Sequence, residues 1–210
     1  MIRYLFGDAL ARHPRLRDSL YRDRAAQFAH RRGWPLQLDA EGREIDQYDA
    51  LNPLHVIWQR PDGSHGGSMR FLPTTGRTML AEYFAHLAPA AAAGRRGVWE
   101  CTRFCLSPGA GGGVAAALMS GAIEMGLALG LSRSVGVFDG RMTRIYARLG
   151  WPPRLLAETG QGPDRLCLGE WTFDPDLRGP LRRRAGLSAQ ALAGWVARDF
   201  GAGGRLDLAA

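Results

Sequence analysis

Apolar and polar positions follow two different periods along this chain, and together they predict a mixture of strands and helices. Short apolar or alternating runs predict strands at residues 2–6, 55–59, 68–72, 98–106, 134–138 and 167–173. Longer segments with apolar residues three or four positions apart predict helices at residues 14–32, 81–93, 114–129 and 140–149. Strands and helices alternate in a mixed order, which is typical of a three-layer α/β sandwich with a mixed central sheet.

The composition changes after residue 173. Residues 174–184 resemble a tether, and Ser188 can then cap an amphipathic helix that ends at Phe200. We therefore divide the chain into a main domain at residues 1–173 and a C-terminal segment at residues 174–210. We expect the C-terminal helix to pack on the core.

Length and composition restrict the class of protein. A chain of 210 residues with 46% apolar content can form one sizeable globular core. No apolar run approaches the roughly 20 residues that cross a bilayer, and the N-terminal segment does not resemble a signal peptide. Of the three cysteines, Cys101 and Cys105 lie on one predicted strand, and we expect them on the same face as buried, reduced thiols. We expect a cytoplasmic protein that binds no metal.

The formal net charge is +7. All 27 of the lysine and arginine residues counted in this charge are arginines, because the chain has no lysine. A surplus of guanidinium groups on a small protein favours acidic partners. Nucleic acid, an acidic carrier protein and the phosphates of coenzyme A all remain candidates.

The stretch from Arg70 to Leu80 (Arg-Phe-Leu-Pro-Thr-Thr-Gly-Arg-Thr-Met-Leu) begins like a strand, turns at Pro-Thr-Thr-Gly and enters a helix. An arginine at the end of a strand directs a planar, permanently charged group into any adjacent cavity. Asp46 and Asp49 could form a charge network with Arg70 and Arg103 that shapes such a cavity. A solvated turn is the ordinary interpretation of the two aspartates.

A second group of candidates lies on and after the first long helix. Arg24 and Phe28 are four residues apart and share one helix face, and Trp34 follows the end of the helix. These residues could belong to an ordinary amphipathic helix. They could also form a flap that presents a guanidinium and two aromatic faces to a ligand.

Glu100 and Arg103 lie three apart on a predicted strand, so strict alternation places them on opposite faces. Both can face one cleft only if the strand twists or bulges between them. We also expect Glu100 to anchor an arginine in a buried ion pair, a role that is compatible with catalysis. The glycine-rich loop at residues 109–113 precedes a helix and could offer backbone N–H groups to phosphate, or it could be a flexible turn.

The two following helices carry flexible apolar side chains that form either plain core or an acyl tunnel: Leu118, Met119, Met125, Met142, Ile145 and Leu149. Four arginines in the same region could meet an acidic carrier protein or form a solvated face: Arg141, Arg144, Arg148 and Arg154.

The Arg-Phe-Leu-Pro-Thr-Thr-Gly string and the residues spaced around it resemble the acyl-homoserine-lactone synthases, the LuxI-type autoinducer synthases. The resemblance extends from about Ile2 to Phe173. It implies the fold of the GCN5-related N-acyltransferases, with a substrate cleft where two central strands splay. It also implies a set of residues that bind S-adenosylmethionine, namely Arg24, Phe28, Trp34, Asp46, Asp49, Arg70, Phe84 and Phe104. The catalytic residues that we expect are Glu100, Asp46 and Arg103.

The resemblance implies a two-step reaction with S-adenosylmethionine as a substrate and no tightly bound cofactor. The amine of S-adenosylmethionine attacks an acyl thioester, and the product closes to a lactone as 5′-methylthioadenosine leaves. The lactone would be a quorum-sensing signal. Glu100 is the candidate base, directly or through a water, and Asp46 is the second candidate.

Other functions remain open on the sequence. An acyl-CoA N-acyltransferase of the same fold would keep the glycine loop without using S-adenosylmethionine, and a basic nucleic-acid-binding module would fit the charge. The thioester could be carried by an acyl-carrier protein, which we favour, or by coenzyme A. We expect a monomer that binds neither nucleic acid nor membrane.

Overall fold

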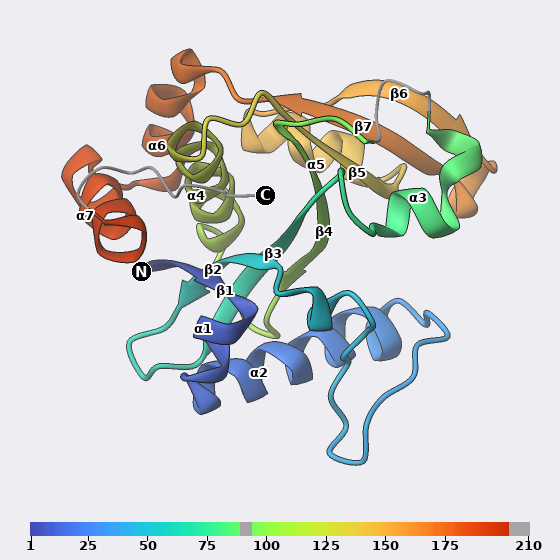
Figure 1. Ribbon diagram of the computed structural model, residues 1–210, viewed down its shortest axis with the longest axis horizontal. Helices are drawn as coiled ribbons and strands as arrows, with labels where there is room; N and C mark the ends of the chain where they lie inside the picture. The colour runs from blue at the N-terminus through green and yellow to red at the C-terminus, as the bar shows by residue number, and fades with distance from the viewer. Residues whose placement is uncertain (89–93, 202–210) are drawn as a thin grey trace.

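A computed structural model describes residues 1–88 and 94–201, and it centres on one seven-stranded mixed sheet (Figure 1). The strand order is β1-β2-β3-β4-β5-β7-β6, and every neighbouring pair is antiparallel except β4 and β5. The strands are β1 (Ile2–Phe6), β2 (Leu54–Gln59), β3 (His65–Pro73), β4 (Val98–Leu106), β5 (Arg133–Asp139), β6 (Arg154–Thr159) and β7 (Leu166–Thr172). The predicted α/β class with a mixed central sheet is confirmed.

Helices cover both faces of this sheet. On one face, α4 (Val114–Ala128), α5 (Met142–Leu149), α6 (Arg178–Ala185) and α7 (Ala189–Phe200) contribute to the largest apolar core. On the other face lie α1 (Gly7–Ala11), α2 (Pro14–Arg24) and α3 (Met79–Tyr83). Short helical turns occupy Asp49–Leu51, Ala85–Leu87, Gly162–Asp164 and Pro175–Leu177. The three layers are visible in Figure 1, where α4 and α2 lie on opposite sides of the sheet.

The parallel pair β4–β5 is the weakest junction of the sheet. Only the positions from Val98 to Glu100 pair with Arg133 to Val135. Gly136 follows, and a Cβ there would lie 2.7 Å from the carbonyl oxygen of Cys101. Beyond this point the two strands diverge, as the resemblance implied, and an opening forms in the middle of the sheet.

Helix 14–32 was predicted as one regular element, and the structure divides it. Residues up to Arg24 are α-helical, whereas Ala25–Arg31 form a π-helix, and Gly33 follows two residues later with a φ of +67°. π-Helical turns are rare and are enriched at functional sites. The change of period therefore marks the segment from Ala25 onward as unusual.

Three other expectations need correction. The predicted helix 81–93 is only α3 and the turn at Ala85–Leu87, and residues 89–93 lie outside the described part of the chain. Strand β6 was missed because it is an exposed edge strand that lacks an alternating apolar face. Most of the expected tether is helix α6, whose Leu181 is buried in the core.

The C-terminal helices pack closely on the main core. Ser188 caps α7 by accepting a hydrogen bond from the Ala191 N–H, as its position predicted. The ring of Phe200 lies 5.0 Å from that of Tyr4 on β1. Asp199 accepts a hydrogen bond from the Tyr4 N–H at 2.8 Å, which occupies one of the donors of this edge strand. The C-terminal end of α7 thus packs against β1, the first strand of the chain.

Candidate active site

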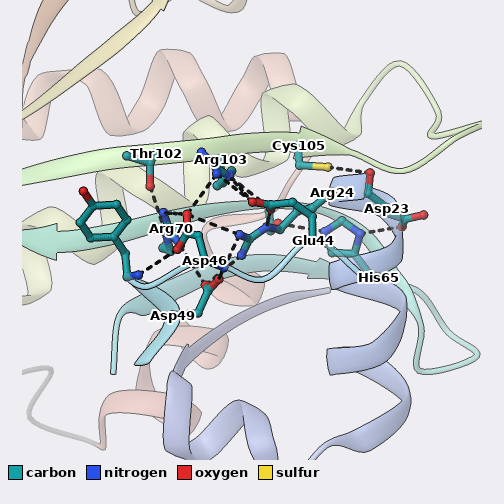
Figure 2. Close-up of polar contacts among 12 residues, drawn as sticks. Asp23, Arg24, Glu44, Asp46, Asp49, His65, Arg70, Thr102, Arg103 and Cys105 are labelled. Carbon is teal, nitrogen blue, oxygen red and sulfur yellow. Dashed lines mark hydrogen bonds and ion pairs between the residues drawn. The ribbon is translucent and has the colours of Figure 1, made fainter. Parts of the chain in front are cut away.

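Three arginines and three carboxylates form one buried network between α2 and the sheet (Figure 2): Arg24, Arg70, Arg103, Glu44, Asp46 and Asp49. Arg24 donates to Glu44 at 2.5 Å and to both oxygens of Asp49 at 2.9 and 3.0 Å. Arg70 binds Asp46 with two nitrogens, at 2.5 and 2.9 Å. Bidentate pairs of this kind hold the guanidinium planes in fixed orientations.

The network is balanced in charge, which makes its burial tolerable. Burial alone would raise the pKa of Glu44, but the guanidiniums of Arg24 and Arg103 outweigh it and hold the pKa below its ordinary value. Asp49 is affected in the same way, with Arg24 and Arg70 holding its pKa well below the usual range. Glu44 and Asp49 therefore remain ionised beside their partners, because each of these charges removed from water has an opposite charge within hydrogen-bond distance.

A β-bulge brings Arg103 into this network. Ser68 and Arg70 on β3 pair with Cys105 and Thr102 on β4, so β4 contains one extra residue. Arg103 takes up the extra residue with a φ of +53°, a left-handed conformation that is costly for a side chain other than glycine. Of the two distortions that would let Glu100 and Arg103 face one cleft, a twist or a bulge, the structure therefore has a bulge.

The same bulge overturns the prediction that Cys101 and Cys105 share a face. Cys101 lines the central cavity, whereas the thiol of Cys105 lies 3.5 Å from the backbone oxygen of Asp23 on α2. The extra residue shifts the alternation by one position between them. Burial raises the pKa of both thiols.

A cavity of about 770 Å³ occupies the opening between β4 and β5. Glu100 and Arg103 both line it. Phe28 of the π-helix and Trp34, which follows that helix, also line it. The ring centroids of Phe28 and Trp34 are 5.1 Å apart and nearly parallel. The guanidinium carbon of Arg103 lies 5.4 Å from the Phe28 ring, so this side of the cavity combines a cation with aromatic faces.

Glu100 is held by the start of α3. Its two oxygens accept hydrogen bonds from the Met79 and Leu80 N–H groups at 3.0 and 2.6 Å, and Thr78 caps the same helix. Burial raises the pKa of Glu100 to about 7, although these hydrogen bonds and two nearby arginines oppose the rise. The hydrogen bonds found for Glu100 run to the backbone of α3, so the expectation that it anchors an arginine is wrong.

The remaining predicted binding residues divide into those that line the cavity and those that lie behind it. Phe84 and Phe104 line it, and Phe104 stacks on Tyr146 of α5 at 6.1 Å. Four charged residues of the network lie behind the wall: Arg24, Asp46, Asp49 and Arg70. One of them, Asp46, pairs with Arg103 at 3.0 Å. Arg24 does not present its guanidinium to the cavity as a surface flap would, because it is 1% exposed and ion-paired on two sides.

The predicted acyl-chain residues divide in the same way. Met119, Met142 and Ile145 line the cavity. Leu118, Met125 and Leu149 belong to the surrounding apolar core and are not in its wall. Helix periodicity identified the apolar faces, but it could not distinguish the face toward the cavity from the face toward the rest of the core.

Sequence reasoning missed Glu44, which is 1% exposed and bonds both Arg24 and Arg103. The available signal was its position two residues before Asp46, since alternate residues of an extended segment lie on the same side. Met79 was also missed as a wall residue, and its sulfur lies 3.5 Å from an Arg103 nitrogen.

Three of the four predicted docking arginines share one exposed helix. Arg141, Arg144 and Arg148 lie at or within α5. Arg154 lies on β6, where it pairs with Glu170 at 2.8 Å, and this places it on the sheet face opposite α5. The structure therefore does not bring Arg154 together with the other three.

The glycine loop reaches the cavity mouth. Gly109 and Ala110 are part of the cavity wall, and α4 begins just after Gly113. Across residues 1–88 and 94–201, no helix has the length and apolar character required to cross a membrane. In that same part of the chain, no three histidine, cysteine or acidic residues cluster closely enough to bind a metal ion.

Comparison with known proteins agrees with this geometry. The family model described as autoinducer synthase matches residues 8–165. An acyl-homoserine-lactone synthase of Rhizobium etli is 37% identical and aligns over 97% of this chain and 99% of its own length.

Two solved structures show the fold. The CoA-dependent acyl-homoserine lactone synthase BjaI, solved with SAM and isopentyl-CoA, has a TM-score of 0.78 at 21% identity, covering 90% of each chain. An acyl-CoA N-acyltransferase from Pseudomonas aeruginosa has a TM-score of 0.53 at 16% identity, covering 81% of this chain and 98% of its own. The overall fold is thus shared with both kinds of acyltransferase.

Proposed function

The chain belongs to the autoinducer synthase family, whose members are acyl-homoserine-lactone synthases, and on this basis we propose how its cavity performs the acyl transfer and lactone closure. The observation that carries the proposal is the opening between β4 and β5, which has Glu100 and Arg103 in one wall and an apolar pocket beyond. The two substrates would meet at this opening from its two sides.

In the first step, the α-amine of S-adenosylmethionine attacks the carbonyl carbon of an acyl thioester. The amide C–N bond forms, the C–S bond breaks, and the amine proton passes through Glu100 to the departing thiolate. In the second step, a carboxylate oxygen of the acylated substrate attacks the γ-carbon of the same methionine unit, which is bonded to the sulfonium sulfur, and the lactone C–O bond forms. That C–S bond breaks, and 5′-methylthioadenosine leaves as a neutral thioether. Both steps balance without an oxidant or a reductant.

Glu100 suits the proton transfer because its pKa lies close to neutral pH. A base with a pKa of about 7 is largely available at pH 7.5, yet it is basic enough to take a proton from an amine. The amine itself has an ordinary pKa of about 7.7–8.0, so the two groups are well matched. A bound water could relay the proton if the backbone hydrogen bonds of Glu100 persist during the reaction.

The S-adenosylmethionine side would be the wall formed by Arg103, Phe28 and Trp34. Arg103 supplies a cation for the carboxylate, and the stacked aromatic pair supplies faces for the adenine and the sulfonium. Asp46, with 14% of its side chain exposed against 4% for Asp49, is the less buried of the two aspartates, and it would hold Arg103 from behind the cavity wall at 3.0 Å. Arg24 and Arg70 would act by holding the two aspartates.

The acyl chain would occupy the apolar part of the cavity between the sheet and α4. Ala115, Met119 and Ala122 form one side of this part. Trp151 and Phe173 also line it, with ring centroids 5.6 Å apart. A Cβ on Gly126 would lie 2.1 Å from the Phe173 ring, so α4 and Phe173 are in direct contact one turn beyond Ala122. We assign this contact as the floor that limits the chain.

We propose an acyl-carrier protein as the donor, with Arg141, Arg144 and Arg148 in its docking surface. These arginines project from an exposed helix next to the cavity residues Met142 and Ile145. Coenzyme A is the other donor, since the cavity mouth also includes the Gly109 loop. We further propose that the enzyme works as a monomer in the cytoplasm; its free thiols and the contact of α7 with edge strand β1 support this.

The decisive assay supplies S-adenosylmethionine with matched acyl-carrier and acyl-CoA donors and measures 5′-methylthioadenosine and lactone by mass spectrometry. We expect both products in equal amounts. An acyl-CoA N-acyltransferase of the same fold would consume thioester without releasing methylthioadenosine, and that result would overturn the proposal.

The placement of S-adenosylmethionine is tested by calorimetry on Trp34→Ala. We expect weaker S-adenosylmethionine binding and an unchanged acyl-chain preference. Trp195→Ala is the matched control, because this tryptophan lies on α7 against Trp58 and not in the cavity wall. An altered product profile with intact S-adenosylmethionine affinity would instead place Trp34 on the acyl side.

A further inference from the structure

A second polar cluster lies between α2 and β3, and the reaction described above does not use it. Asp23 Oδ2 lies 2.7 Å from His65 Nδ1, and His65 Nε2 lies 2.9 Å from Ser68 Oγ. His65 is 0% exposed and Ser68 is 2% exposed. Figure 2 shows the Asp23–His65 contact beside the arginine network.

The order Asp–His–Ser is that of a hydrolase triad, but the surroundings exclude that role. A nucleophilic serine must reach its substrate. Ser68 is buried, and none of the three residues is in the cavity wall. A thioester bound in the cavity therefore has no path to Ser68.

The protonation of His65 follows from its partners. Burial lowers the pKa of His65, although Asp23 opposes the shift, so the ring is neutral at physiological pH. The Asp23 carboxylate can only accept, which assigns the ring proton to Nδ1 and makes Nε2 the acceptor for the Ser68 hydroxyl. Both ring nitrogens of His65 then have a partner, and the ring has one favoured orientation.

The position of the cluster suggests its role. Asp23 immediately precedes Arg24, at the junction where α2 changes into the π-helix Ala25–Arg31. Ser68 lies two residues before Arg70 on the same face of β3. The cluster therefore connects α2 and β3, two of the three elements that supply network arginines, at the point where the helix changes its period.

We propose that Asp23, His65 and Ser68 are positioning residues that lock the junction of α2 and the π-helix onto β3. Through this junction they hold Arg24 against its carboxylates and Phe28 in the cavity wall. The inference rests on the proposed function, because it assigns to the cluster the geometry of the S-adenosylmethionine side. Small displacements of a binding wall can cost large factors in affinity and rate.

The test measures S-adenosylmethionine affinity by calorimetry, well below the melting temperature of each variant. Asp23→Ala removes the acceptor for His65, and we expect affinity to fall about 10-fold, with thioester affinity unchanged. Asp23→Asn keeps an oxygen acceptor and should stay within about 3-fold of the parent protein. Ser68→Ala, a smaller perturbation of the fold, should weaken affinity in the same direction.

Ser19→Ala is the matched control. Ser19 Oγ accepts a hydrogen bond from the backbone N–H of His65 at 2.9 Å, so this variant loosens the same helix–strand contact without touching the ring. We expect reduced thermal stability and unchanged S-adenosylmethionine affinity. Equal weakening in Ser19→Ala and Asp23→Ala would show that any loss of helix docking suffices, and it would overturn the assignment.

The failure of this inference is distinct from failure of the proposed function. If the parent protein binds no S-adenosylmethionine and releases no methylthioadenosine, the proposed function fails. If the parent protein does both while Asp23→Ala and Ser68→Ala bind normally, the positioning role fails. An acyl group found on Ser68 by mass spectrometry after incubation with thioester would also overturn it.

Discussion

Glu100 combines two tasks in one side chain, because it caps α3 and faces the cavity. Glu100→Gln removes the titrating group, and we expect turnover to fall roughly 10²–10⁴-fold, as for loss of a general base. The amide also replaces one acceptor with a donor opposite a backbone N–H, so stability should fall as well. Steady-state kinetics together with thermal melting separate the two effects.

Thr78→Ala is the control for the capping task. Thr78 caps α3 from its side chain and is not in the cavity wall. Its removal should cost about 1 kcal/mol of stability and leave turnover within a few-fold of the parent enzyme. Near-normal turnover in Glu100→Gln would mean that Glu100 only supports α3.

The pH dependence of the reaction should reflect two ionisations. With the Glu100 pKa raised to about 7, the carboxyl loses its base function as pH falls through 7, and the substrate amine becomes protonated in the same range. The logarithm of kcat/KM for S-adenosylmethionine should therefore fall with a slope of about two below pH 7. In Glu100→Gln the slope should drop to about one, and an unchanged slope of two would exclude Glu100 as the titrating base.

At the scale of single elements, α5 should govern donor encounter. Reversing Arg144 and Arg148 to glutamate should lower kcat/KM for acyl-carrier protein several-fold at low salt, and the loss should fade as salt rises. S-adenosylmethionine binding should not change. The control, Arg12→Glu with Arg17→Glu, makes the same charge change at α1 and α2 on the other face of the sheet.

The comparison of donors adds a second criterion. A broad acidic carrier should lose more than coenzyme A, whose phosphates would lie mainly at the Gly109 loop. An equal loss of kcat/KM in the α5 variant and in its control would show that the effect depends only on the net charge of the protein. If kcat/KM does not fall at any salt concentration, these arginines are not part of the docking site.

Helix α4 should set the acyl-chain limit. Ala122→Leu fills the cavity one turn before the floor at Phe173, so the lactones should shorten by several carbons in mass spectra. Ala117→Leu overpacks the same helix at an equally buried position that is not in the cavity wall, at a cost of about 1–3 kcal/mol. Equal shortening in both variants would contradict the assigned floor.

At the scale of the whole molecule, the arginine network is a part of the fold as well as of the site. Arg24→Ala leaves Glu44 and Asp49 buried without their shared partner, and it should lower the free energy of unfolding by about 3–5 kcal/mol. Arg22→Ala, two residues earlier, removes an exposed pair with Asp18 and an exposed hydrogen bond to the Glu41 carbonyl oxygen, and it should cost less than about 1 kcal/mol. Denaturant titration of both variants measures the difference, and similar losses would contradict a structural role for the network.

Secondary structure and family were accessible from the sequence because they depend on local pattern. Apolar periodicity located most strands and α4, and the string from Arg70 to Leu80 identified the relatives. The π-helix and strand β6 were not accessible. The first depends on how α2 docks onto β3, and the second is an edge strand without an apolar face of its own.

The same distinction between local pattern and tertiary contacts applies to the candidate site. The sequence by itself determined which residue types gather, and it required a bulge if Glu100 and Arg103 were to face one cleft. Only the tertiary structure decided which of these residues touch the cavity and which stand behind it. Arg24, Arg70 and Glu44 are sequestered because three cations and three carboxylates can be buried only together, and that balance exists only once segments far apart in the chain have met.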